Sequence, residues 1–157
     1  MELVVIPTGS GKYNVIDTKD RKLYSVTKKR KLVGNSITTL HDASGYALYS
    51  MVRTESGKKP AFHIFLNGTV VLRVLCKSMF LSPCIVLEGS DFGYEMRGEQ
   101  VTHFHIFQGD FEVGTLDTEI QTNGEPKYRI TIEQKYFDDF FPLFAVIVDK
   151  CYGTGVK

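Results

Sequence analysis

The sequence of 157 residues contains no tryptophan and only three cysteines and five prolines. The cysteines, Cys76, Cys84 and Cys151, are odd in number and have neither the spacing of a disulfide framework nor that of a zinc site. We therefore expect reduced, mostly buried thiols in a cytoplasmic protein.

Long hydrophobic runs and an excess of one charge are also absent. No segment approaches the roughly 20 apolar residues that a membrane-spanning helix needs, and the N-terminus lacks the pattern of a signal peptide. The formal net charge of +1 argues against a strongly basic nucleic-acid-binding protein. The length predicts one domain over residues 1–157. We expect the protein in the cytoplasm, where peripheral binding to a membrane surface is a second expectation.

What the chain does contain is a series of short strand-like runs separated by turn residues. Eleven Phe and eight Tyr suit a pleated, sheet-rich core. Asn67-Gly68 is a favoured two-residue hairpin turn, and Tyr128, Ile130 and Ile132 alternate with polar residues, as in a strand with one wet face. This pattern predicts ten or eleven antiparallel strands, over residues 13–16, 23–27, 36–40, 46–53, 61–66, 69–77, 84–87, 94–97, 102–107, 111–116 and 127–134.

A tetrapeptide, FHIF, occurs twice, at residues 62–65 and 104–107, and each copy precedes a glycine-containing turn and a second strand. Residues 13–16 (YNVI) form a weaker third copy before another hairpin. Repeated hairpins would build one large sheet, and closing that sheet would remove its exposed edges. The alternative is chance similarity among strands of narrow composition.

Residues 140–148 read FFPLFAVIV, nine residues without a polar side chain. A helix of this composition must be buried on all sides, and only strands are available to surround it. We therefore predict an all-β fold with one buried helix, a closed antiparallel barrel around a central apolar C-terminal helix. Burying its side chains would contribute on the order of 10–20 kcal/mol, so truncation before Asp138 should yield insoluble or molten protein. A helix lying in a membrane interface is the alternative, but the run lacks the basic polar face of such helices.

The two ends of this helix carry recognisable signals. Asp138 or Asp139 is expected to cap its N-terminal amides, and Pro142 is tolerated only in the first turn. Asp149 and Lys150 are expected to expose the C-terminal end of the helix to solvent, and Gly153 is expected to end the helix.

The order of these segments resembles the LURP-one-related proteins, part of a wider tubby C-terminal-like group that includes phospholipid scramblases. The resemblance rests on GYEMRG, EVGTL, KYRITIE and DDFFPLFAVIVDK in that order, and it spans about Tyr13 to Cys151. It implies a barrel of about 12 strands enclosing the helix, with a further strand in Leu3–Ile6. Tubby-like members bind phosphoinositide headgroups through basic side chains on the barrel surface, and scramblases are associated with membranes and calcium. This chain has no DxDxDG-type calcium loop, and no individual lipid-contacting residue can be carried over to it.

One concentrated charge feature is a candidate binding site. Its residues are Lys28, Lys29, Arg30 and Lys31, with Arg21 and Lys22, and also Lys19, on the adjoining hairpin. Such cations can contact the phosphates of an anionic membrane. Each contact contributes an attraction of about 1 kcal/mol, and salt screens this attraction. A nuclear-import or RNA contact and a merely solvated turn are the alternatives.

Several other patterns resemble functional sites but lack the required context. Thr8–Lys12 is similar to a nucleotide-binding P-loop, yet neither the first glycine nor the residue after the lysine fits, and a strand follows where a helix is required. His63 and His105 have no identifiable further ligands for a metal, and no nucleophile elbow accompanies Ser, His and Asp. We expect Cys84 to have a packing role, and Asp138–Asp139 to act in capping instead of acid–base catalysis.

These observations predict a non-catalytic binding module with no catalytic residues, no metal and no cofactor. Because the helix fills the interior, we expect no deep central pocket of the kind that houses most small-molecule chemistry. The expected partner is an anionic membrane lipid, recognised through the basic loop, or a protein; a nucleic acid is not expected. A structural or protein-interaction domain without a lipid ligand is the alternative. A lipid-handling enzyme would need a surface cleft with perturbed titratable groups.

Overall fold

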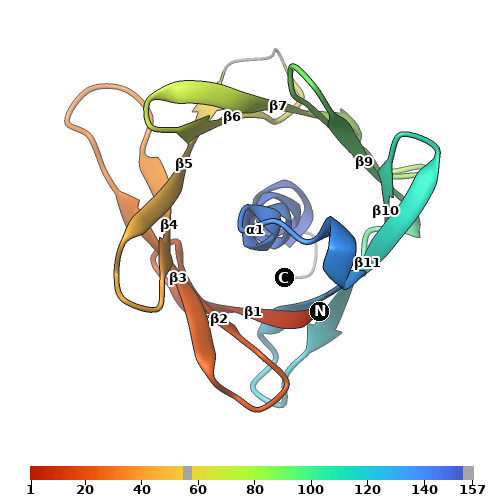
Figure 1. Cartoon of the computed structure of the whole chain (residues 1–157), viewed down its shortest axis with the longest axis horizontal. Coiled ribbons are helices and arrows are strands. Elements are labelled where there is room, and N and C mark those ends of the chain that lie inside the picture. Colours follow the sequence, from red (N-terminus) through yellow and green to blue (C-terminus); the bar gives the residue numbers. More distant parts are fainter. Residues whose placement is uncertain (55–57, 154–157) are drawn as a thin grey trace.

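In the computed structural model, which describes residues 1–54 and 58–153, twelve antiparallel strands form a closed barrel around one helix (Figure 1). Each strand pairs with its neighbours in sequence, and β1 pairs with β12 to close the ring. The predicted fold is confirmed, and the strand expected at Leu3–Ile6 is part of β1. The strands are β1 (Glu2–Gly9), β2 (Lys12–Ile16), β3 (Lys22–Lys29), β4 (Ile37–Asp42), β5 (Ala47–Thr54), β6 (Ala61–Leu66), β7 (Thr69–Ser78), β8 (Cys84–Glu88), β9 (Gly93–Gln100), β10 (His103–Gln108), β11 (Phe111–Ile120) and β12 (Pro126–Ile132).

The repeated tetrapeptides occupy corresponding places in the ring. The three copies lie on β2, β6 and β10, which are spaced four strands apart. In each copy the pairing with the next strand shifts register after the third residue, at Val15, Ile64 and Ile106. The shared position of these bulges supports an internal repeat of hairpin units over chance similarity.

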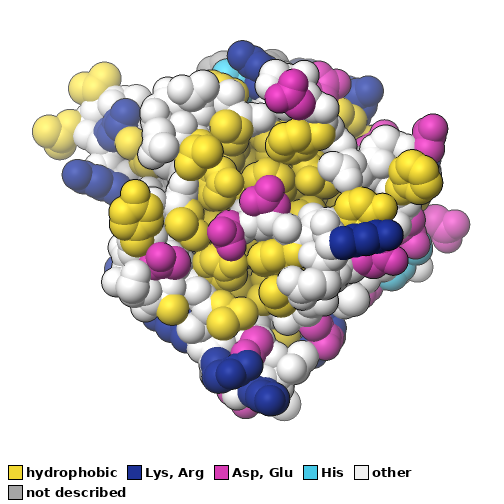
Figure 2. Space-filling view, viewed as in Figure 1, with side chains coloured by type: hydrophobic (Ala, Val, Ile, Leu, Met, Phe, Trp, Pro, Cys, Tyr) yellow, Lys and Arg dark blue, Asp and Glu magenta, His cyan; other side chains and the backbone are white. Residues whose placement is uncertain are grey.

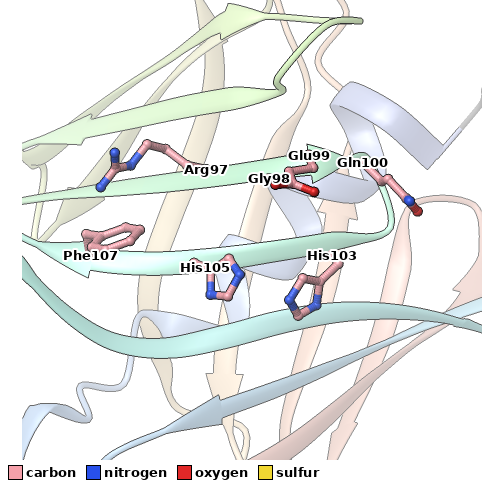
Figure 3. A pocket seen from close by; sticks show the side chains of 7 residues that line it. All are labelled: Arg97, Gly98, Glu99, Gln100, His103, His105 and Phe107. Carbon is pink, nitrogen blue, oxygen red and sulfur yellow. The ribbon is translucent and has the colours of Figure 1, made fainter.

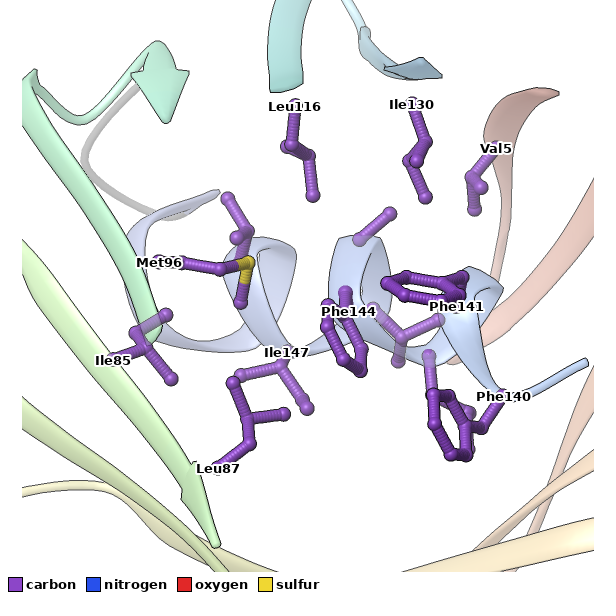
Figure 4. Packing of buried hydrophobic residues seen from close by; sticks show 14 of the residues in the cluster. Val5, Ile85, Leu87, Met96, Leu116, Ile130, Phe140, Phe141, Phe144 and Ile147 are labelled. Carbon is purple, nitrogen blue, oxygen red and sulfur yellow. The ribbon is translucent and has the colours of Figure 1, made fainter. Parts of the chain in front are cut away.

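A short 3-10 helix, η1 (Gln134–Tyr136), leads into α1 (Phe141–Tyr152), which runs along the barrel interior. Every non-proline side chain from Phe140 to Val148 is 2% exposed or less. Figure 4 shows Phe140, Phe141, Phe144 and Ile147 surrounded by inward-pointing side chains from several strands. The apolar run is therefore the core of the barrel, as predicted, and Pro142 lies in the first turn.

The N-terminus of α1 differs from the prediction. Phe140 is the N-cap residue, and no side chain caps the helix. The Asp139 carboxylate instead accepts a hydrogen bond from the Tyr24 hydroxyl at 2.5 Å, and Asp138 accepts one from the Asp139 amide at 2.8 Å. The capping prediction was wrong because a tyrosine on a strand far away in sequence competes for the carboxylate.

The C-terminus of α1 also differs from the prediction, because the helix does not reach the solvent after Lys150. Cys151 and Tyr152 are buried, and the Tyr152 hydroxyl donates to the Ser78 carbonyl oxygen at 2.6 Å. Asp149 is held by the hydroxyls of Tyr13 and Tyr128. Gly153 ends the helix as predicted, but in a right-handed conformation. A Cβ there would lie 2.6 Å from the Asp149 carboxylate, so close packing accounts for this glycine.

The barrel has two ends of different character. Because neighbouring strands are antiparallel, the loops that follow odd-numbered strands lie at one end, together with the C-terminus of α1. Among the described residues, this basic end carries Lys12, Lys28, Lys29, Arg30, Lys31, Arg53, Lys58, Lys59, Lys77 and Lys150, with Glu99, Glu125 and Asp149. The other, acidic end carries Asp17, Asp20, Asp42, Glu88, Asp91, Asp110, Glu133, Asp138 and Asp139, with Lys19, Arg21, Lys22 and Lys135. Figure 2 looks onto the acidic end, where carboxylates lie over hydrophobic side chains at the mouth of the barrel.

Candidate functional site: a basic pocket at one end of the barrel

The predicted basic run spans the end of β3 and the loop that follows it. Lys28 and Lys29 are the last residues of β3, and Lys29, Arg30 and Lys31 are exposed. Lys28 is half-buried because it shares the inward face of β3 with Val26. Its stem crosses Gly11 in the β1–β2 turn so closely that a Cβ on this glycine would lie 2.5 Å from Lys28 Cδ. The run therefore divides into one cation that turns inward and three that face water.

Lys28 lines a surface pocket of about 270 Å³ at the mouth of the barrel. Two further cations meet it there: Arg53 from the end of β5 and Lys150 from α1. The Asn35 side-chain amide donates to the Arg53 carbonyl oxygen at 2.6 Å and ties the β3–β4 loop to β5. We call this the basic pocket; its lining residues are Lys28, Asn35, Ser36, Thr38, Met51, Arg53, Phe62 and Lys150.

The electrostatics of the basic pocket are unbalanced. Burial lowers the pKa of Lys150, and the positive charges of Lys28 and Arg53 lower it further, against an opposing effect of Asp149. The Asp149 carboxylate is engaged by Tyr13 and Tyr128 instead of by a cation. Among residues 1–54 and 58–153, no acidic side chain forms a salt bridge with Lys28, Arg53 or Lys150. Three cations that converge without a salt-bridge partner among the described residues form a site suited to an anion.

The remaining residues of the predicted site lie at the opposite end of β3. Arg21 Nε is 2.7 Å from the Asp17 carboxylate, which also accepts the backbone amides of Lys19 and Arg21. Lys22 is exposed at the start of β3. At about 3.3 Å per residue, Lys22 and Lys29 are roughly 23 Å apart. The structure therefore does not bring Arg21 and Lys22 together with Lys28–Lys31.

Sequence reasoning missed Arg53 and Lys150, since they lie 25 and 122 positions after Lys28 and only barrel closure makes them neighbours. It also missed Leu32 and Val33, two fully exposed apolar residues directly after the basic run. A signal for this pair was available: an apolar dipeptide in a polar loop where no strand was predicted.

The other sequence patterns form no comparable arrangement. Thr8–Lys12 spans the end of β1, the turn at Ser10 and Gly11, and the start of β2, with Gly9, Ser10 and Gly11 at φ of 100°, 55° and 73°. Cys84 lies next to Glu95, and burial, followed by this carboxylate, raises the pKa of its thiol to about 11. A thiol with such a pKa is a poor nucleophile at neutral pH. Cys76 and Cys151 are buried and free, in agreement with the predicted thiols.

A second pocket, of about 470 Å³, lies on the outer wall of β9 and β10 (Figure 3). The Arg97 guanidinium stacks 4.0 Å from the Phe107 ring centroid. His103 Nδ1 hydrogen-bonds to Asp117, and His105 Nδ1 lies next to Glu112 without hydrogen-bond alignment. His63 is four strands away on β6. The part of the chain that the structure describes contains no group of three or more His, Cys, Asp or Glu side chains that could hold a metal ion.

None of the helices in residues 1–54 and 58–153 has the length and apolar character needed to span a membrane. No curated protein and no solved structure matches the chain. The model of the LURP-one-related family matches residues 4–149, from β1 to the last turn of α1, and the chain therefore belongs to the LURP-one-related family.

Proposed function

We propose that this protein is a non-catalytic binding module that recognises a phosphate-bearing anionic lipid headgroup at a membrane surface. The observation that carries the proposal is the convergence of Lys28, Arg53 and Lys150 on one pocket without a salt-bridge partner among the described residues. A phosphate would compensate their mutual repulsion, and an arginine can bind it with two parallel hydrogen bonds.

The exposed cations beside the pocket extend the same surface. Lys29, Arg30 and Lys31 continue directly from Lys28, and Lys58 and Lys59 lie at the same end of the barrel. In this proposal the pocket selects the headgroup and the outer cations add attraction to an anionic leaflet, about 1 kcal/mol per cation near the surface. The cytoplasmic leaflet, which is rich in anionic lipid, is the proposed location.

The test is co-sedimentation with vesicles that contain or lack phosphoinositide. The variant Lys28→Gln/Arg53→Gln/Lys150→Gln removes the three pocket cations, and about 3 kcal/mol of lost attraction corresponds to roughly 100-fold weaker binding. The matched control Lys19→Gln/Lys22→Gln/Lys135→Gln removes the same charge from the acidic end and should bind within a few-fold of wild type. Equal, salt-insensitive binding by wild type and the pocket variant would exclude the basic pocket as the lipid site.

A protein-interaction function without a lipid ligand is the second candidate. The Arg97–Phe107 stack in the outer-wall pocket favours it, because arginine and aromatic residues are enriched at protein interfaces. Wild-type protein that binds no vesicles at any salt concentration but retains a protein partner in a pull-down would support this candidate in place of lipid recognition.

A further inference from the structure

Two loops at the basic end expose apolar side chains at their tips. Leu32 and Val33 in the β3–β4 loop are 106% and 87% exposed, and Phe80 and Leu81 in the β7–β8 loop are 87% and 88% exposed. These four residues, the apolar loop pairs, are the most exposed large hydrophobic side chains in the described chain.

The apolar loop pairs share one end of the barrel because β3 and β7 are both odd-numbered strands. Cations flank both pairs: Lys29, Arg30 and Lys31 precede Leu32, and Lys77 lies at the end of β7 before Phe80. The β3–β4 loop projects from the barrel at the upper left of Figure 1, and in Figure 2 the same corner carries hydrophobic and Lys/Arg side chains next to one another.

We propose that both apolar loop pairs insert into the outer acyl region of an anionic bilayer while the flanking cations contact its headgroups. This inference rests on the proposed function and adds how the barrel sits on the membrane: with its basic end against the lipid. Apolar side chains buried at the headgroup boundary, together with adjacent basic residues, are the two attractions that peripheral membrane binding combines.

The arrangement favours a bilayer over a protein partner. The pairs follow strands that are four apart in the ring, and the pocket near the first of them is lined largely by polar and cationic side chains. A stable protein interface normally has a contiguous, largely apolar core from which charged residues are depleted. A fluid bilayer accepts separated apolar tips and attracts the charges between them.

The chain has no tryptophan, so a single introduced tryptophan reports on its own surroundings. Leu32→Trp and Phe80→Trp place the reporter in the two loops. Tyr46→Trp and Phe111→Trp place it at the acidic end, where the native side chains are 68% and 71% exposed. With phosphoinositide vesicles, we expect a blue shift and quenching by brominated acyl chains at positions 32 and 80, and neither effect at positions 46 and 111. Equal quenching at all four positions, or none at 32 and 80 while the variants still co-sediment, would overturn the inference.

A second comparison separates this inference from the proposed function. The variant Leu32→Ser/Val33→Ser/Phe80→Ser/Leu81→Ser should bind soluble inositol trisphosphate like wild type, yet bind vesicles at least tenfold more weakly at high salt. The pocket variant should lose both activities. Undiminished vesicle binding by the serine variant would overturn insertion and leave headgroup recognition standing. If wild type binds neither inositol trisphosphate nor vesicles, the proposed function fails, and insertion fails with it. An unchanged thermal unfolding midpoint in the serine variant is required for this comparison.

Discussion

The acidic end and the basic end of this barrel are built from the same antiparallel strands but treat charge in opposite ways. At the acidic end, Asp139 accepts a tyrosine hydroxyl, Asp17 pairs with Arg21, and Asp42 accepts the amides of Ser44 and Tyr46. These bonds lower the pKa values of Asp17 and Asp42, chiefly through the Arg21 amide and the Ser44 hydroxyl respectively. At the basic end, Lys28, Arg53 and Lys150 have no salt-bridge partner among the described residues.

Packing follows the same division. At the acidic end, the rings of Tyr49, Phe92 and Tyr94 lie 5.8, 6.1 and 5.7 Å from that of Phe140 and close the barrel mouth where α1 begins. Burial, with Asp138 as the second cause, raises the pKa of Tyr94 to about 12. At the basic end, two loops carry Leu32, Val33, Phe80 and Leu81, which are more exposed than Tyr46 and Phe111 at the acidic end. At the acidic end, hydrogen bonds and ring contacts within the fold engage the charged and aromatic side chains, whereas at the basic end three cations lack a salt-bridge partner among the described residues and two loops carry the most exposed apolar side chains.

The largest effect should come from the core that both ends share. Phe144 is fully buried in the middle of α1, and Phe144→Ala should reduce the free energy of unfolding by about 3–5 kcal/mol through lost burial and a cavity. The control Phe111→Ala removes an exposed ring at the acidic end and should change the free energy of unfolding by about 0.5 kcal/mol or less. Urea denaturation measures both values. Similar losses for the two variants would contradict the central position of the helix.

A smaller effect concerns the pH dependence of anion binding at the basic end. The pKa of Lys150 lies below the ordinary 10.5, so the unfolded chain binds more protons than the folded protein in the interval between the two values, and stability rises with pH there. A bound anion favours the ammonium form, and binding takes up a proton in the same interval. Affinity for inositol trisphosphate should therefore fall as the pH rises through this interval toward the ordinary lysine value of 10.5.

Isothermal titration of wild type and Lys150→Gln across this pH range tests the assignment. The variant should bind more weakly at neutral pH and should lose most of the pH dependence. An identical pH dependence in both proteins would assign the titration to another group.

The smallest predicted effect is on vesicle binding, and it separates a steric clash with the Lys28 side chain from backbone strain at a glycine. Gly11 and Gly9 have φ values of 73° and 100°, so Gly11→Ala and Gly9→Ala should each reduce stability by about 1–2 kcal/mol. Only a Cβ at Gly11 meets the Lys28 stem, whereas nothing lies within 4 Å of one at Gly9. Gly11→Ala should therefore also weaken vesicle binding a few-fold by displacing Lys28. Equal binding by the two variants would show that the stem accommodates the methyl group.

Much of the fold could be predicted because its signals are local. The Asn67-Gly68 turn joins β6 and β7 as expected, and both residues adopt the positive φ that such a hairpin requires. The alternation of Tyr128, Ile130 and Ile132 with polar residues places these three side chains inside the barrel. Asp138 and Asp139 were misassigned as helix caps because Tyr24, more than 110 positions earlier, supplies the partner of Asp139.

The candidate site could be predicted only in part. Four adjacent cations were visible as a charge run, but strand alternation turns Lys28 inward while Lys29 faces water. Arg21 and Lys22 looked like neighbours of the run because they are close in sequence, yet an extended strand carries them to the opposite end of the barrel.

The sequence by itself determined that the chain forms strands around a buried helix, because side-chain periodicity and an unbroken apolar run act over a few residues and leave few alternatives. Only the tertiary structure decided which cations share a pocket and which apolar side chains stand at the same end. Those relations depend on the direction and order of the strands in the closed ring, which place Lys28, Arg53 and Lys150 side by side although a large part of the chain separates them.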